Sequence, residues 1–118
     1  MADELLDLVL AGTKRATAGS VADYDAEGDV VPEVGDFEIV TDGELRPRAV
    51  LQFTHVRIGP LSSVDDQFAF DEGEGDRTRD YWLAEHTDFF ARTQPAGIDF
   101  DPDMATVFQR FDLLHHED

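Results

Sequence analysis

A hairpin signal in the middle of the chain places the tightest limit on the fold. Phe37 and Ile39 alternate with polar neighbours, Asp42-Gly43 is a strong turn dipeptide, and an apolar segment at about 48–58 follows. That segment alternates imperfectly, because apolar residues occur at both parities. We expect either that both faces of this strand are partly covered or that a bulge moves its apolar side chains from one face to the other. Both arrangements occur in a small closed barrel.

The N-terminal residues predict a helix followed by a turn and a strand. Residues 3–11 carry apolar side chains at helical spacing, and Gly12 suits the left-handed position that ends a helix. In an unbroken strand Lys14 and Thr17 would point to opposite faces. They can converge only if the chain turns between them, so we expect Lys14 in the turn and Thr17 at the start of the strand.

The remaining segments predict a loop before the hairpin, two helices after it and a final strand. Residues 21–36 are interpreted as mostly loop, and Ser63 with Asp66 has capping-box spacing for a short helix with Phe68 and Phe70. Residues 71–76 are interpreted as a flexible acidic loop whose last residue, Asp76, caps the longest helix. The apolar side of that helix, at about 77–93, is predicted to carry Trp82, His86, Phe89 and Phe90.

A loop at 95–102 and a closing strand at 104–114 complete the expected order, and the tail 115–118 is expected to fray. The chain is thus expected to combine helices with antiparallel strands. Its sequence has no internal repeat. The class is α+β, compatible with a small barrel flanked by helices. With 118 residues, 42% of them apolar, we expect a single domain over 1–118.

Charge and composition limit the cellular setting and the partners. The formal net charge is −18 at pH 7, there is no cysteine, and Lys14 is the only lysine beside eight arginines. No apolar run approaches the length of a membrane span, and we expect a cytoplasmic protein with no membrane partner. Acid spread along the whole chain is typical of a salt-rich cytoplasm. At ordinary salt the same charge repels a polyanion, so extended RNA binding needs a local basic patch.

Several site classes fail on their spacing. The acidic loop has Gly73 and Gly75 where a calcium-binding loop needs acidic ligands, and the four histidines lack zinc spacing. No serine-hydrolase elbow and no phosphate-binding glycine loop is present. We therefore expect neither a metal nor another cofactor. His86 is interpreted as a core residue beside Trp82.

The stretch from Gly12 to Ser20 has two interpretations. It can be a plain junction, with Gly12 ending a helix and Lys14 near the negative end of the helix dipole. It also has the form Gly-x-Lys-x-x-Thr. That pattern resembles the signature of the ASCH domain family, whose PUA-like small β-barrels are associated with RNA and modified nucleosides.

The resemblance recurs at separated points and covers nearly the whole chain. The further points that carry it are Pro32-Glu33-Val34-Gly35-Asp36, Ala69-x-x-Glu72-Gly73-x-Gly75-Asp76, Tyr81-Trp82, His86, Phe89-Phe90 and Phe100-Asp101-Pro102-Asp103-Met104. Their order and spacing are similar to those of stand-alone bacterial and archaeal ASCH proteins, and they imply a small PUA-like β-barrel flanked by helices. Arg15 and Gly19 depart from the pattern, standing where relatives often carry a small hydroxyl residue and a serine.

The family resemblance implies a catalytic set. Some similar ASCH proteins are amidohydrolases that remove acyl groups from N4 of cytidine with a Lys, a Thr and a Glu, which by motif are Lys14, Thr17 and Glu72 here. A threonine hydroxyl becomes nucleophilic when a base takes its proton, and lysine can be that base where desolvation favours its neutral form. Our hypothesis is that Thr17 attacks the acyl carbonyl, Lys14 activates it and then stabilises charge, and Glu72 is the general acid/base.

Two other functions remain open at the level of sequence. Other relatives are implicated in binding or cleaving RNA, and in that case Lys14 would meet a phosphate of single-stranded RNA and Tyr24 would stack on a base. For either ligand we expect contacts from Arg15, Ser20, Tyr24 and Arg110. The third possibility is a module that binds its ligand without catalysis. The sequence leaves the oligomeric state open.

Overall fold

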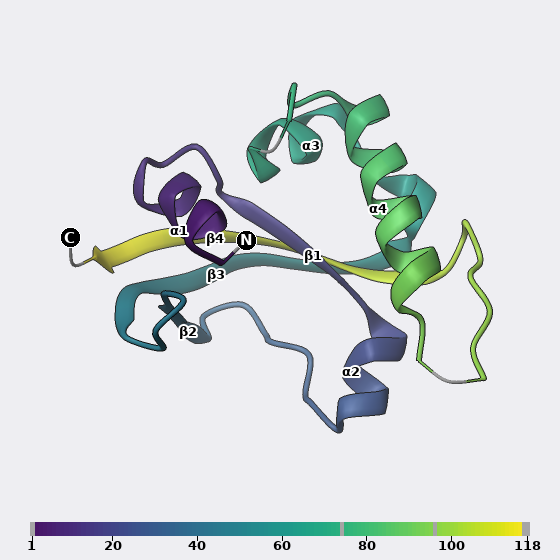
Figure 1. The fold of residues 1–118 in the computed structure, drawn as a ribbon, viewed down its shortest axis with the longest axis horizontal. Helices are drawn as coiled ribbons and strands as arrows, with labels where there is room; N and C mark the ends of the chain where they lie inside the picture. Colours follow the sequence, from purple (N-terminus) through teal and green to yellow (C-terminus); the bar gives the residue numbers. More distant parts are fainter. Residues whose placement is uncertain (1, 74, 96, 117–118) are drawn as a thin grey trace.

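In the part of the chain that the structure describes, one four-stranded antiparallel sheet is flanked by four α-helices (Figure 1). The computed structural model describes residues 2–73, 75–95 and 97–116. Its elements, in chain order, are α1 (Ala2–Leu10), β1 (Ala16–Ser20), α2 (Val21–Glu27), β2 (Phe37–Thr41), β3 (Pro47–Pro60), the 3-10 helix η1 (Leu61–Ser63), α3 (Asp66–Glu72), α4 (Arg79–Thr93) and β4 (Ala105–His116).

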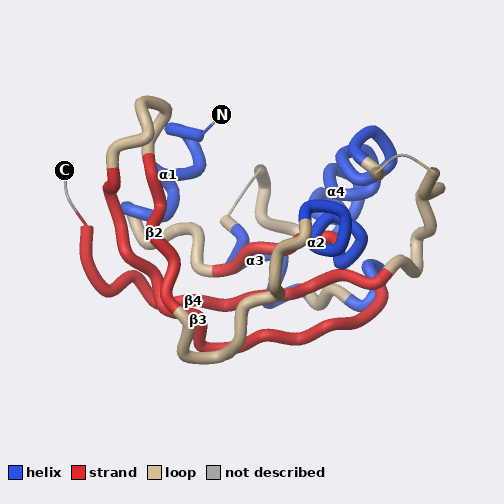
Figure 2. Tube along the Cα trace, turned by 90° about the horizontal axis from the view of Figure 1, so that it is seen from below, coloured by secondary structure: helices blue, strands red, loops and turns tan. Residues whose placement is uncertain are grey.

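The sheet has the strand order β1-β4-β3-β2, so the long β3 and β4 form its centre and the short β1 and β2 its edges. The strands curl into a trough-shaped half-barrel (Figure 2). The α+β class, with a small barrel-like sheet flanked by helices, is therefore confirmed. Among the described residues, no helix is long and apolar enough to cross a membrane.

A bulge explains the imperfect alternation of β3. Phe53 pairs with Phe111 and His55 pairs with Arg110, so Thr54 is an extra residue in β3. The extra residue moves the inward positions from odd to even numbers: Phe53 is buried before it, and Val56 packs on the same cluster after it. Of the two explanations that the sequence offered, the bulge is confirmed.

Two apolar clusters cover the two faces of the sheet. Residues paired across antiparallel strands share a face, and successive residues of β4 alternate between faces. The face with Phe108 packs on α3 and α4, in a cluster of Ala16, Leu61, Val64, Phe68, Ala69, Trp82, Phe90 and Phe108. The opposite face packs on α1, in a smaller cluster of Val9, Leu51, Phe53 and Phe111. The second face is the inner one of the half-barrel.

Residues 21–27 form a helix, so the prediction of a loop there is wrong. Nothing in α2 is fully buried, so the helix carries no apolar stripe to reveal it. It is held at its ends instead. The Ser20 hydroxyl accepts from Asp23 N at 3.4 Å, and Gly28 ends the helix in the left-handed region at φ 70°.

The two predicted helix caps are each wrong by two residues. Asp65, rather than Ser63, caps α3 by accepting from Phe68 N at 2.7 Å. Thr78, rather than Asp76, caps α4, and Asp76 instead accepts from Thr78 N at 2.9 Å. In each case a second short polar residue beside the predicted one competes for the same role.

Three further expectations need correction. Asp71 and Glu72 belong to α3 rather than to an acidic loop, and Glu74 lies outside the described residues. Phe89 is exposed rather than on the buried side of α4. The first two residues of the predicted frayed tail, 115 and 116, are paired in β4, whereas 117–118 lie outside the described residues.

Candidate active site

The segment between α1 and β1 is fixed at both ends by backbone hydrogen bonds. Gly12 leaves α1 in the left-handed region at φ 78°, as expected, and Lys14 N donates to Leu8 O at 3.0 Å. Arg15 N then donates to Asp71 O at 2.6 Å, and Phe111 N donates to Arg15 O at 3.1 Å. The turn that carries Lys14 is thereby held between the end of α3 and the central strand β4.

Lys14 makes a buried ion pair with Glu72. The Lys14 Nζ donates to Glu72 Oε2 at 3.1 Å and to the Glu72 carbonyl oxygen at 3.4 Å. The side chains are only 8% and 2% exposed, which is unusual for either residue type. Removing one partner of such a pair strands the other charge in a poorly solvated place. The only lysine of the chain is therefore committed to a residue 58 positions away.

A glycine allows Glu72 to approach this closely. Gly73 ends α3 at φ 77°, and a Cβ added to it would lie 2.6 Å from the Thr13 carbonyl oxygen. No other residue type fits there without moving the backbone next to Lys14. The end of α3 therefore contacts the α1–β1 turn through two neighbouring residues, Glu72 by its ion pair and Gly73 by its close approach.

His86 extends the buried pair toward α4. Its Nδ1 lies 2.9 Å from Trp82 O, and since a carbonyl only accepts, Nδ1 carries a hydrogen. The other ring nitrogen, Nε2, lies 3.9 Å from Glu72 Oε2, and the imidazole stacks on Trp82 with centroids 3.8 Å apart. The sequence placed His86 in the core beside Trp82. The contact with Glu72 was missed, because nothing in the α4 pattern says what the helix faces.

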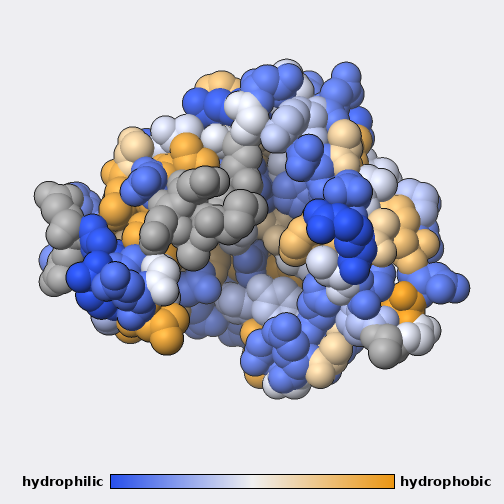
Figure 3. Space-filling model, viewed as in Figure 1, coloured by the Kyte–Doolittle hydropathy of each residue, from blue (hydrophilic) through white to orange (hydrophobic). Residues whose placement is uncertain are grey.

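Lys14 and Thr17 line one cleft on the inner face of the half-barrel. Its volume is about 400 Å³, within the range of small-molecule sites. Figure 3 shows this side of the molecule hollowed near its centre. The cleft is lined by Leu6, Val9, Lys14, Thr17, Glu38, Ile39, Val40, Thr41, Leu51 and Phe111, so it runs from α1 and β1 across to β2. Thr17 is half-buried.

Tyr24 lies on the same face of the sheet as Thr17. Gln109 pairs with Thr17 across β1 and β4, and its Nε2 donates to the Tyr24 hydroxyl at 3.2 Å. A Cβ on Gly19 would lie 3.2 Å from the Tyr24 ring, so the ring rests on the β1 backbone. Burial raises the pKa of Tyr24, and the Gln109 contact opposes that rise.

The other predicted contact residues lie in different surroundings. Ser20 is buried and caps α2. Arg15 is exposed, and its Nε donates to Gly12 O at 3.1 Å. Arg110 pairs with Asp71 and lies over the Phe68 ring, on the sheet face that packs on α3 and α4. The structure places Lys14 and Thr17 in one cleft, with Glu72 bound to Lys14 and Tyr24 on the sheet face of Thr17, whereas these three residues do not line the cleft.

Glu38 is a cleft residue that sequence reasoning missed. It lies on β2, and burial by the cleft walls raises the pKa of its carboxyl. The signal was present in the sequence as a charged residue between Phe37 and Ile39, but alternation alone does not tell which face is inside.

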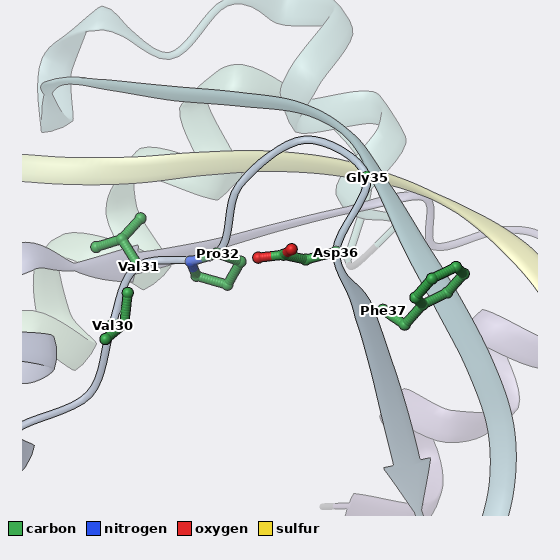
Figure 4. Close-up of a pocket in the computed structure, with 6 residues that line it drawn as sticks. All are labelled: Val30, Val31, Pro32, Gly35, Asp36 and Phe37. Carbon is green, nitrogen blue, oxygen red and sulfur yellow. The ribbon is translucent and has the colours of Figure 1, made fainter.

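A second hollow lies outside this region. Val30, Val31, Pro32, Gly35, Asp36 and Phe37 surround a shallow space of about 440 Å³ beside β2 (Figure 4). Its one carboxylate, Asp36, is directed at Pro32 in Figure 4 and accepts from Glu33 N at 2.8 Å, closing the loop on itself. It offers no group for catalysis. In the described part of the chain, no cluster of histidine or acidic residues could hold a metal ion.

Comparisons with known proteins agree on one family. The sequence matches the model of the ASCH domain over residues 1–115. The fold is similar to a crystal structure of an ASCH domain from Lactobacillus crispatus JV V101, with TM-score 0.87 and 33% identity over 97% of this chain and 72% of that one. A protein from Enterococcus faecalis V583 gives TM-score 0.84 and 38% identity over 94% of this chain and 67% of that one. A search of curated proteins finds no match.

Proposed function

The chain belongs to the ASCH domain family, and from that premise we propose that it hydrolyses the N4-acyl amide of a cytidine-type nucleoside. The observation that carries the proposal is the buried Lys14–Glu72 pair, with Nζ and Oε2 3.1 Å apart, beside the cleft that Thr17 lines. A nucleophile, a base and an acid are the groups that this reaction needs.

One proton transfer within the ion pair produces both the base and the acid that the reaction needs. In its charged form Lys14 cannot accept a proton. Transfer of one proton along the Lys14–Glu72 hydrogen bond leaves a neutral amine beside a carboxylic acid, and a buried setting lessens the cost of losing the charges. Lys14 can then take the hydroxyl proton of Thr17, while Glu72 holds the proton that the leaving amine requires.

The chemistry then follows an acyl-enzyme path. The Thr17 oxygen attacks the acyl carbon and its proton passes to Lys14, whose positive charge stabilises the oxyanion that forms. The C–N4 bond breaks as Glu72 protonates N4, which releases the cytidine amine. Water then attacks the Thr17 ester, and the acyl group leaves as a carboxylic acid.

The cleft suits a neutral nucleoside better than a polyanion. Its apolar side chains, Leu51 and Phe111, can contact the flat face of a base, and its volume of about 400 Å³ exceeds that of a nucleoside. Glu38 adds a negative charge, as does the net charge of −18, and both oppose phosphates. Arg110, one candidate phosphate contact, is paired with Asp71. RNA binding or cleavage is therefore the weaker of the two candidates.

Hydrolysis of N4-acetylcytidine, followed by absorbance at molar salt, tests the proposal with Thr17→Val and Thr17→Ser beside the wild type. Valine keeps the shape of threonine without its hydroxyl, so Thr17→Val should abolish turnover, while Thr17→Ser should keep part of it. Thermal melts confirm that each variant folds. Full activity in Thr17→Val would remove Thr17 as the nucleophile.

The same assay distinguishes the other two functions. Lys14→Ala should lose turnover but retain affinity for the nucleoside, whereas in a non-catalytic module it should lose binding. No turnover by folded wild type would reject the amidohydrolase, and binding and cleavage of a short single-stranded RNA would then be measured.

A further inference from the structure

The first residues of strand β2 depart from the usual polarity. Phe37 and Ile39 have apolar side chains that are 64% and 62% exposed, and Glu38 between them is also exposed but lies on the inner face and lines the cleft. The register establishes this, because Glu38 pairs with Leu51, which is 3% exposed and belongs to the inner cluster. Folding alone favours the opposite pattern, with the charge outside.

The Glu38 carboxylate faces the cleft without a protein partner. In the described part of the chain, no hydrogen bond or ion pair reaches it. Desolvation raises the pKa of the Glu38 carboxyl, although the side chain as a whole is exposed. Its charge in turn contributes to the raised pKa of Tyr24, so the two side chains lie within electrostatic range. A carboxylate so placed is an acceptor for a ligand's hydrogen-bond donors.

Resting on the proposed function, we propose that Glu38 binds the sugar of the substrate. Its two oxygens accept from the 2′ and 3′ hydroxyls of a ribonucleoside whose acyl group lies at Thr17. A pair of adjacent hydroxyls matches the two acceptors of a carboxylate, as a planar base edge with mixed donors and acceptors does not.

The dimensions of the half-barrel agree with this arrangement. Strands β1 and β2 are the two edges of the curled sheet, with β4 and β3 between them, and Thr17 on β1 and Glu38 on β2 line the same cleft. Curling shortens the distance across the mouth. The acyl carbon and the 2′ oxygen of the ribose are separated by about eight bonds of ~1.4 Å, which makes roughly 8 Å in an extended nucleoside because the ring path is not straight.

The negative charge of Glu38 should also select against substrates that carry a phosphate beside the sugar. A carboxylate beside the sugar repels a phosphate on the neighbouring 5′ carbon. The site should therefore prefer a free nucleoside to its 5′-monophosphate. It should also prefer the ribonucleoside to the free base.

Steady-state kinetics of Glu38→Gln and Glu38→Ala test the assignment with three substrates, N4-acetylcytosine, N4-acetylcytidine and N4-acetylcytidine 5′-monophosphate. Loss of a hydrogen bond to a charged acceptor should lower kcat/KM for the nucleoside by about tenfold or more, mainly through KM. The value for the free base should stay within about twofold, and discrimination against the monophosphate should weaken. Glu44→Gln, whose side chain is 75% exposed on the same hairpin, controls for the lost charge.

Equal losses for the free base and the nucleoside would overturn the sugar contact, as would no loss for either. Titration of cytidine and cytosine into wild type and Glu38→Gln, followed by NMR, separates the two proposals. Preference for cytidine that disappears in Glu38→Gln supports the sugar site even if no acyl group is hydrolysed. Turnover in the wild type without such a preference retains the proposed function and rejects this inference.

Discussion

Two buried carboxylates differ in how far along the sequence their cationic partners lie. One is in the β2–β3 hairpin, and the other is beside the cleft. Asp42 is 6% exposed, and its partners lie within six residues: Oδ1 accepts from Glu44 N and Arg46 N, and Oδ2 from Arg46 Nε and Arg48. Glu72 is 2% exposed, and its ion-pair partner Lys14 lies 58 residues away. Asp42 and its arginines line a small hollow of about 140 Å³, whereas Lys14, the partner of Glu72, lines the cleft of about 400 Å³ together with Thr17.

The difference matches our proposal of a structural ion pair in the hairpin and a reactive one beside the cleft. The Asp42 oxygens accept from donors on the hairpin itself, so they hold the turn in shape. Glu72 instead joins the end of α3 to the turn before β1, and through the 3.9 Å contact with His86 it also reaches α4. Such a pair costs stability that apolar residues would not, which makes function the better reason for keeping it.

Of the substitutions that test this comparison between Asp42 and Glu72, Glu72→Gln should have the largest effect on turnover. The amide keeps the shape of the side chain but can neither receive nor supply the proton, so activity should fall by about 10²- to 10⁴-fold in the N4-acetylcytidine assay. Stability should fall too, because Lys14 remains buried without its counter-charge.

The double variant Lys14→Met/Glu72→Leu separates these two effects. Apolar replacement of both partners should restore much of the lost stability, measured by urea unfolding, and none of the turnover. Activity in the double variant would mean that this pair is structural, like the one at Asp42.

Gly73→Ala should have the next largest effect. The new methyl group would be 2.6 Å from Thr13 O, so the end of α3 must move away from Lys14. We expect a loss of about 1–3 kcal/mol in stability and a reduced kcat, since small misplacements of catalytic groups are costly.

Gly28→Ala is the matched control for Gly73→Ala. Gly28 ends α2 at φ 70° but has nothing within 4 Å of an added Cβ, so it carries only the backbone cost of the left-handed conformation. If both variants lost turnover equally, the close approach of Gly73 to Thr13 would have no part in aligning Glu72.

Asp42→Asn should have the smallest effect on turnover, and its effect should fall on stability. Backbone and arginine hydrogen bonds lower the pKa of Asp42 to about 2. Because the folded value lies below the unfolded one, the stabilisation is present above about pH 4 and is lost as the pH falls toward about 2. The wild type should therefore unfold at higher urea than the variant at neutral pH, and the difference should shrink with acidification. A constant difference would contradict the lowered pKa.

The contrast between the two carboxylates also shows what sequence patterns can reveal. The Asp42-Gly43 dipeptide predicted the place of the hairpin, although Leu45 at φ 62°, rather than Gly43, takes the left-handed position. Gly12 was predicted correctly as the end of α1, as was Lys14 in the turn after it. Helix α2 was missed because its ends, rather than an apolar stripe, hold it. Glu72 was assigned to a loop, and only the family resemblance singled it out.

Local signals determined the elements of this protein. Turn dipeptides, a helix-ending glycine and apolar alternation act over a few residues, so they gave the α+β class, the hairpin and the junction at Lys14 from the sequence alone. Tertiary structure decided which groups meet. The burial of Lys14 against Glu72, the contact with His86 and the inward direction of Glu38 depend on how the sheet curls and on where α3 and α4 pack. These are long-range contacts, and no local pattern encodes which face of an element another will cover.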